Sequence, residues 1–113
     1  MLQDEQIVRL YWNRDPDAIA QTDLKYGTFC MRIAKNILRD LSDAEECVND
    51  TYLKAWDSIP PQRPVAFSAF LGKIIRNLAL DRYRYYHAQK RQCQMETLLS
   101  ELETCIPASE RVE

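Results

Sequence analysis

The chain has 113 residues, a length that suits one domain with a single core and is too short for two independently folded halves. It is 46% hydrophobic and 28% charged, which is too apolar for disorder, and its scarce glycine and abundant Leu, Ala, Glu and Arg favour helices. The acidic N-terminus has no following apolar run, so we expect no secretory signal, no membrane insertion and a cytoplasmic protein.

Charge is segregated along the chain, although the formal net charge is only −2. The segment Asp40–Asp57 holds six acidic residues against one lysine, a net charge of −5. The segment Lys73–Arg91 holds six basic residues against one aspartate, a net charge of +5. Such a distribution predicts two faces of opposite sign, which suit two different partners.

The residues that usually build reactive sites are sparse. The four cysteines form no C-x-x-C pair, and the single histidine, His87, lies six residues before Cys93. This spacing argues against zinc, and Cys47 fits a small buried thiol on an apolar stripe. Without a glycine-rich phosphate loop or a suitable carboxylate pair, the sequence predicts no catalytic residues, no metal site and no cofactor.

The start signals and apolar spacing predict an all-α fold, a compact bundle of about four helices. The first helix begins after Asp4 and ends near Asn13. Asp15 caps the second, with Pro16 at its first position, where a missing amide donor costs nothing. The apolar stripe expected on this second helix consists of Ile19, Tyr26, Cys30, Ile33 and Ile37.

The third helix carries the clearest pattern. Ser42 and Glu45 match an S-x-x-E capping box that would open it. One face is predicted to be a continuous core stripe, made of Ala44, Cys47, Val48, Thr51, Tyr52, Ala55, Trp56 and Ile59. The opposite face is polar except for Leu53, which we therefore expect to be exposed.

Three prolines stiffen the connection Ile59–Val65, because each fixes its own backbone and restricts the residue before it. A long fourth helix follows, and its second half becomes basic and aromatic. Its expected core stripe is Phe67, Phe70, Leu71, Ile74, Ile75 and Leu78. We expect a helical domain over residues 1–93, then a tail over 94–113 with one weak helical turn before Pro107 and the start of a polar linker.

Two runs, DAEECVNDTYLKAWDSI and FSAFLGKIIRNLALDRYR, resemble region 2 of bacterial RNA polymerase sigma factors of the extracytoplasmic-function (ECF) class. Upstream, RDPDAIAQTDLKYGTF resembles the opening helix of that family, so the resemblance extends from Glu5 to Arg91. Nothing resembles the helix-turn-helix domain by which such factors bind the upstream promoter element. The chain is therefore expected to be a fragment that ends at an interdomain boundary.

The resemblance implies that the exposed face of the third helix binds the clamp helices of the largest subunit of core RNA polymerase. The residues at the matching positions are Glu46, Asn49, Asp50 and Leu53. An exposed leucine with a polar rim suits a basic partner helix on physical grounds as well, although a solvated helix face would show the same acidic pattern. An inhibitory anti-sigma factor is a further implied partner.

The resemblance also implies that the fourth helix and the preceding loop bind the non-template strand of the −10 promoter element. The candidate residues are Gln62, Arg63, Ser68, Lys73, Arg76, Asn77 and Arg84. Cations along phosphates and aromatic or amide surfaces for unstacked bases are what single-stranded DNA binding requires. A solvated basic helix end with inward-packed tyrosines is the alternative interpretation of the charge alone.

Two other classes of function remain open at this point. A helical regulatory adaptor would use the acidic face to bind only protein, but it has no need of a +5 segment, and a gel shift with single-stranded DNA and polymerase would decide. An all-helical enzyme is the other class. With a single histidine and no glycine-rich loop, the sequence offers few residues from which a catalytic site could be built.

Overall fold

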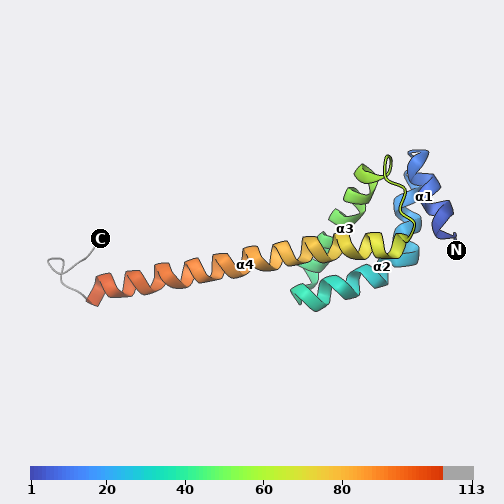
Figure 1. The fold of residues 1–113 in the computed structure, drawn as a ribbon. Helices are drawn as coiled ribbons and strands as arrows, with labels where there is room; N and C mark the ends of the chain where they lie inside the picture. Colours follow the sequence, from blue (N-terminus) through green and yellow to red (C-terminus); the bar gives the residue numbers. More distant parts are fainter. Residues whose placement is uncertain (106–113) are drawn as a thin grey trace. The chain divides into compact units, whose positions relative to one another are not determined.

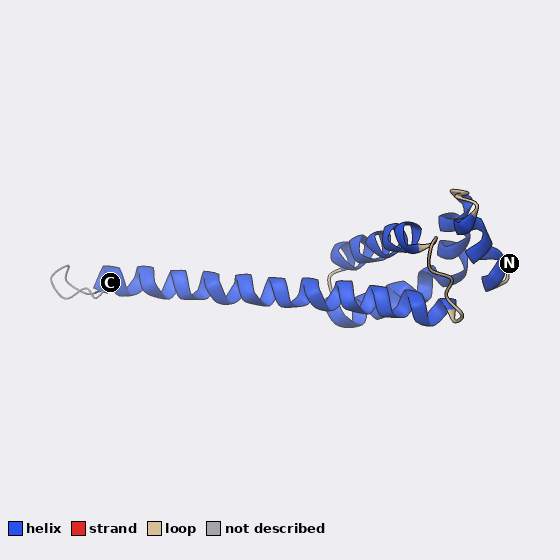
Figure 2. Cartoon of the chain, turned by 45° about the horizontal axis from the view of Figure 1, so that its top comes forward, coloured by secondary structure: helices blue, strands red, loops and turns tan. Residues whose placement is uncertain are grey.

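Four helices make up the described part of the protein in the computed structural model, which describes residues 1–105 and side chains as far as residue 96 (Figure 1). They are α1 (Asp4–Trp12), α2 (Asp17–Leu38), α3 (Leu41–Ser58) and α4 (Phe67–Cys105). Within residues 1–105 there are only helices and connecting loops, which confirms the predicted all-α class (Figure 2). The chain divides into two compact units, Met1–Arg82 and Tyr83–Glu113, and the helical bundle is the first unit.

The turn between α1 and α2 departs from the expected start of the second helix. α2 begins at Asp17, so Pro16 lies at the capping position and not at the first helical position as predicted. Asp15 still contributes to this start, because its Oδ1 accepts a hydrogen bond of 3.0 Å from the Asp17 amide. Arg14 adopts a left-handed backbone (φ 54°), a conformation that is uncommon for residues other than glycine.

The start of α3 was predicted incorrectly. The cap is Asp40, whose Oδ1 accepts a 3.0 Å hydrogen bond from the Asp43 amide, and the helix begins at Leu41. Ser42 therefore lies inside the first turn, and the S-x-x-E motif is not the capping box. An aspartate at the cap satisfies an otherwise unpaired amide and favours the positive end of the helix dipole.

The core of the first unit lies between the inner faces of all four helices. The predicted α3 stripe is confirmed, since every member from Ala44 to Ile59 is buried except Trp56, which is partly buried and packs against the core. The predicted α2 stripe also contacts the core, since Cys30 is fully buried and Ile19, Tyr26, Ile33 and Ile37 are partly buried and pack against it. The prediction missed Ala18, Thr22 and Ala34, which are fully buried on the same helix.

Gly27 leaves space for the Asp23 side chain, which joins α2 to α3. A Cβ at this position would lie 2.8 Å from Asp23 Oδ1, the atom that accepts a 2.7 Å hydrogen bond from the Tyr52 hydroxyl of α3. The hydroxyl oxygen itself would be 3.6 Å from that Cβ. Glycine therefore leaves room for the bond that joins the two helices.

Aromatic rings connect α4 to the other helices at its first turn. Phe67 is buried, and its ring lies 6.0 Å from that of Tyr11 in α1 and 5.7 Å from that of Tyr26 in α2. The Tyr11 hydroxyl is itself buried and shares a 2.7 Å hydrogen bond with Thr22 Oγ1, so no polar atom of this pair is left unsatisfied. Further along α4 the core positions are Leu71, Ile75 and Ala79.

The second unit contains the remainder of α4. The helix continues to Cys105, so the single weak turn predicted after Gln94 is an underestimate. All side chains from Tyr83 to Glu96 are exposed. The predicted polar linker beginning at Pro107 lies outside the described residues. In the described part of the chain, no helix combines the length and apolar character that crossing a membrane would require.

Candidate functional site

The outer face of α3 presents the four predicted polymerase-binding residues together. Glu46, Asn49, Asp50 and Leu53 follow helical spacing, and all four side chains are exposed. Leu53 keeps 56% of its surface accessible, although the other side of the same helix is the domain core. The face therefore combines one apolar side chain with carboxylate and amide groups.

An ion pair joins this face to α4. Arg82 Nη1 lies 2.6 Å from Glu46 Oε2 and 3.6 Å from Asp43 Oδ1. One cation of the basic segment thus neutralises part of the acidic segment, so the two charged faces are less separate than their net charges suggest. Asn49, Asp50 and Leu53 lie beyond this contact along α3.

The loop between α3 and α4 is anchored from the turn after α1. Arg14 Nη1 donates 2.8 Å hydrogen bonds to the carbonyl oxygens of Trp56 and Ile59, and its guanidinium lies 3.8 Å from the Trp56 ring centroid. The backbone N–H of Gln62 donates a 2.9 Å hydrogen bond to the Ser58 carbonyl oxygen, which closes the first turn of the loop. This anchoring has no signature in the local sequence, because Arg14 is separated from Trp56 by 42 positions.

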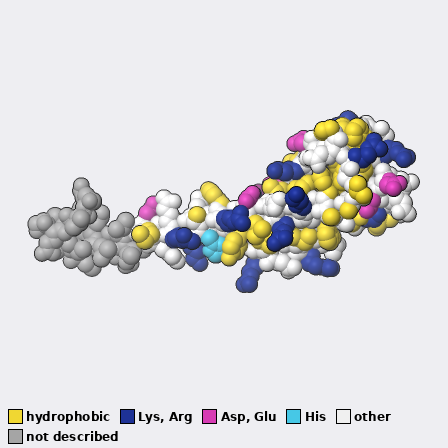
Figure 3. Space-filling view, viewed as in Figure 1, with side chains coloured by type: hydrophobic (Ala, Val, Ile, Leu, Met, Phe, Trp, Pro, Cys, Tyr) yellow, Lys and Arg dark blue, Asp and Glu magenta, His cyan; other side chains and the backbone are white. Residues whose placement is uncertain are grey.

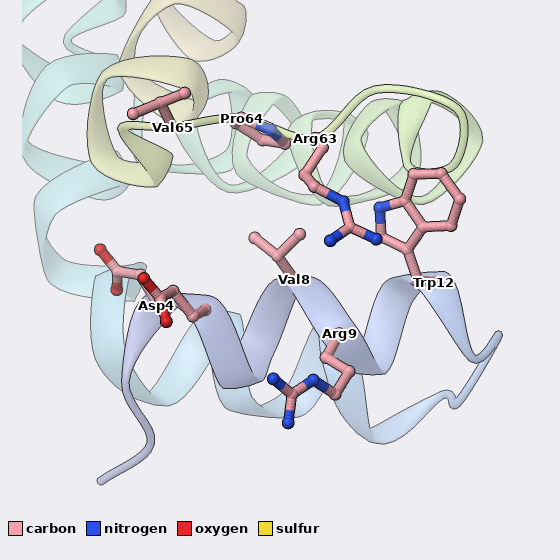
Figure 4. A pocket seen from close by; sticks show the side chains of 8 residues that line it. Asp4, Val8, Arg9, Trp12, Arg63, Pro64 and Val65 are labelled. Carbon is pink, nitrogen blue, oxygen red and sulfur yellow. The ribbon is translucent and has the colours of Figure 1, made fainter.

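The far end of the loop faces α1 and encloses a pocket of about 380 Å³ (Figure 4). Arg63 leaves the loop towards α1, and its guanidinium lies 4.7 Å from the Trp12 ring centroid. The residues that line the pocket are Asp4, Glu5, Val8, Arg9, Trp12, Arg63, Pro64 and Val65. Sequence reasoning proposed Arg63 but missed Trp12 and the pocket, since α1 and the loop meet only in the folded chain.

The remaining DNA-binding candidates lie on the loop and on α4. Gln62, Lys73, Arg76 and Asn77 are exposed, and Ser68 is partly buried. Lys73, Arg76 and Asn77 occupy the first unit beside the buried α4 positions Leu71 and Ile75. Lys and Arg side chains are interleaved with apolar ones on the visible face of the molecule (Figure 3).

Arg84 belongs to the second unit, where it is exposed among aromatic side chains. Tyr83 and His87 lie one helical turn apart with ring centroids at 4.0 Å, and the rings of Tyr85 and Tyr86 are 5.9 Å apart. The alternative interpretation, in which the tyrosines pack inward, is wrong for Tyr83, Tyr85 and Tyr86, because all three are exposed. The stretch offers cations and accessible rings on one helix.

Titratable groups near the loop and core serve the fold. Burial acts to raise the pKa of Asp4, but hydrogen bonds from Lys25 and Tyr26 and the Lys25 charge outweigh it and hold that pKa below its ordinary value. Burial, followed by the hydrogen bond to Asp4, raises the pKa of Tyr26 to about 12. Burial also raises the pKa of Cys30 to about 11 and raises that of Cys47, so both thiols stay protonated at neutral pH.

A comparison with known protein families identifies the family of this chain. A model of sigma-70 region 2 matches residues 24–89, more than half of the chain. The chain belongs to the sigma-70 region 2 family. Sigma factors are transcription initiation factors and not enzymes, and their region 2 binds core RNA polymerase and promoter DNA, which supports the same general function here.

The matched segment of region 2 contains α3, the loop and the first part of α4, whereas α1 lies outside it. All the proposed polymerase-binding residues and all the proposed DNA-binding residues are therefore inside the match. A search of curated proteins and a search of solved structures give no match.

Proposed function

We propose that this region 2 domain is of the ECF class, that it binds the clamp helices of the largest polymerase subunit, and that it captures the non-template strand of the −10 element. The observation that carries the proposal is Leu53, which is 56% exposed at the centre of a polar helix face whose reverse side is core. Single exposed leucines are common, and Leu24 and Leu41 are exposed as well, so what distinguishes Leu53 is its place beside Asn49 and Asp50 within the segment that the sigma-70 region 2 model matches.

The α3 face has the composition of a small docking site. Leu53 provides an apolar anchor, and Asn49 and Asp50 provide a polar rim that favours a helix with basic side chains. Glu46 already forms an ion pair with Arg82 within the chain, so its proposed role is to fix the edge of this face. Asp50 would supply the carboxylate that contacts the partner. Loss of Asp50 or Leu53 should accordingly weaken binding more than loss of Glu46.

DNA capture would use the loop and the start of α4. Lys73 and Arg76 supply cations for phosphates, and the Asn77 amide lies one residue further along the helix. No nucleotide hydrolysis is required for strand opening, because an extruded base costs a few kcal/mol and a fitted pocket returns about 1–3 kcal/mol per stacked base. Polymerase holds the duplex while base capture drives melting.

A double substitution on α3 tests polymerase binding. Asp50→Lys with Leu53→Ala should abolish co-purification with core polymerase, because it reverses the charge of the rim and removes the anchor. Since both side chains are exposed, helical circular dichroism and melting temperature should change little. A folded double mutant that still binds polymerase would refute the assignment.

A matched control uses Leu41→Ala with Glu96→Lys. Leu41 is 54% exposed on α3, close to the exposure of Leu53, and Glu96 is an exposed acidic residue of α4. The control makes the same chemical changes away from the proposed face and should bind polymerase like the unmodified chain. Loss of binding in both double mutants would point to a general charge effect.

The loop Ser58–Val65 is proposed to choose the captured base of the −10 element. A base-selective pocket needs fixed hydrogen-bonding groups, and the prolines, together with the Arg14 hydrogen bond to the Ile59 carbonyl, limit the conformations of this loop. Exchange for the loop of a relative with another promoter should move the preference to that relative's −10 base, in a full-length factor and without loss of polymerase binding. Unchanged preference in an active protein would transfer base selection to α4.

A further inference from the structure

A second pocket opens on α2, outside the surfaces proposed for polymerase and for DNA. Its volume is about 620 Å³, and its wall includes Gly27, Thr28, Met31 and Asn36. The pocket borders α3 at Gly27, where an added Cβ would lie 3.6 Å from the Tyr52 hydroxyl oxygen. This hollow is called the α2 pocket below.

The charged lining of the α2 pocket is mainly basic. Arg32 and Lys35 both line it and are exposed. Asp23 lines it as well, but its Oδ1 accepts the 2.7 Å hydrogen bond from the Tyr52 hydroxyl, so this carboxylate already has a partner within the chain. Leu24, which is 64% exposed, adds apolar surface on the same side of α2 by helical spacing. The α2 pocket therefore suits an apolar side chain that is flanked by carboxylates.

The outer face of α3 offers such a side chain. Leu53 is exposed, and the exposed Asp50 and Asp57 lie about one helical turn before and after it on the same side of the helix. A projecting apolar side chain with carboxylates on α3 is thus the counterpart, in shape and in charge, of a hollow with cations on α2.

These two features are neighbours on one compact unit. Both helices belong to the unit Met1–Arg82, and they are joined at the α2 pocket by the hydrogen bond between Tyr52 and Asp23. Leu53 directly follows Tyr52 on α3. A surface with a projection beside a matching hollow is self-complementary, because two copies related by a twofold axis form the same contact twice. A different partner would need only one of the two features.

We propose that a second copy of this chain docks on this surface, with Leu53 of each copy in the α2 pocket of the other. Asp50 and Asp57 of one copy then approach Arg32 and Lys35 of its partner. The contact is small and its charge pairs lie at the exposed rim, so the dimer should be weak, with a dissociation constant on the order of 10 µM.

The dimer would cover the α3 face that the proposed function gives to polymerase, so self-association and polymerase binding should exclude each other. This consequence rests on the proposed function, whereas the dimer itself does not. At a total concentration tenfold above the dimer dissociation constant, about a fifth of the chains is monomeric, which should lower the apparent affinity for polymerase about fivefold. Polymerase would then draw its factor from an inactive dimer pool.

Sedimentation equilibrium of the unmodified chain, over about 1 to 300 µM, measures the association directly. We expect a monomer–dimer equilibrium that shifts towards monomer when salt is raised from about 0.1 to 0.5 M, because salt screens the charge pairs at the rim.

An exchange of charges between copies tests which residues meet. Arg32→Glu with Lys35→Glu should give a monomer, because both charged surfaces are then acidic. Asp50→Lys with Asp57→Lys should also give a monomer, because both are then basic. An equimolar mixture of the two variants should restore the dimer, since each copy then offers the sign that the other needs. Circular dichroism checks that each variant is folded.

Arg9→Glu with Lys90→Glu is the matched control. Both residues are exposed and lie outside the α2 pocket and the α3 face, and the change in net charge is the same as in the Arg32 and Lys35 variant. The control should dimerise like the unmodified chain. The Arg32 and Lys35 variant should keep polymerase binding, and at tenfold the dimer dissociation constant its apparent affinity should be about fivefold higher than that of the unmodified chain.

Three outcomes overturn the inference while the proposed function stands. The first is an unmodified chain that stays monomeric over the whole concentration range. The second is a mixture of the two charge variants that stays monomeric although each variant is folded. The third is loss of polymerase binding in the folded Arg32 and Lys35 variant, which would assign the α2 pocket to polymerase. A chain that dimerises and obeys the charge exchange, but does not bind polymerase, would instead refute the proposed function and leave the dimer standing.

Discussion

The outer face of α3 and the pocket edge of the loop are two exposed surfaces of the same domain, but they are built differently. On α3, Asn49, Asp50 and Leu53 are placed by a single helix, so their relation follows from helical spacing. The pocket edge needs α1 and the loop together, with Arg63 reaching Trp12 across 51 positions of sequence. Only the second surface depends on tertiary contacts for its shape.

This difference predicts how each surface responds to substitution. Asn49, Asp50 and Leu53 on the α3 face can be exchanged without disturbing the core, because their side chains are exposed, whereas Glu46 is paired with Arg82. Changes in the contacts that hold the loop should alter both stability and the pocket, because the same residues serve both.

A pair of leucine truncations gives the largest expected effect. Leu71→Ala removes a fully buried side chain of α4 and should lower the free energy of unfolding by about 2–5 kcal/mol. Leu53→Ala, with the same chemistry on an exposed site, should change it by less than about 0.5 kcal/mol. Urea denaturation of both variants measures the contrast, and a large loss for Leu53→Ala would show that the α3 face is structural.

Removal of the loop anchor should have an intermediate effect. Arg14→Ala deletes the hydrogen bonds to the Trp56 and Ile59 carbonyls and the contact with the Trp56 ring, and should cost about 1–2 kcal/mol in unfolding free energy. Arg32→Ala, at an exposed position of α2, is the control and should be nearly neutral. Equal stability of the two variants would mean that the loop does not need Arg14.

The smallest expected effect is on the salt dependence of single-stranded DNA binding when one arginine of α4 is removed. Each neutralised phosphate contributes about −0.7 to the slope of log affinity against log salt, so Arg76→Ala and Arg84→Ala should each make the slope shallower by somewhat under one unit. Glu45→Gln on the outer side of α3 should leave it unchanged, since this residue belongs to the other surface. An unchanged slope in both arginine variants would place these side chains away from the phosphates.

Much of the architecture could be predicted because it depends on local patterns. The α3 stripe from Ala44 to Ile59 followed from spacing alone, as did the exposure of Leu53. The helix starts were less predictable, because Asp40 and Ser42 are both good caps and only the path of the chain selects one. The α2 stripe was predicted only in part, since its five residues all contact the core but the fully buried Ala18 and Ala34 were missed, because small residues carry little hydrophobic signal in a sequence pattern.

The sequence by itself determined the helical class, the periodic face of α3 and, through its motifs, the family that the match over residues 24–89 supports. Tertiary structure alone decided that Arg82 pairs with Glu46, that Arg14 holds the loop and that Arg63 meets Trp12. The physical reason is the separation along the chain over which each interaction acts. Helical periodicity and capping act within a few residues, whereas ion pairs, ring contacts and pockets join segments that only the folded core brings together.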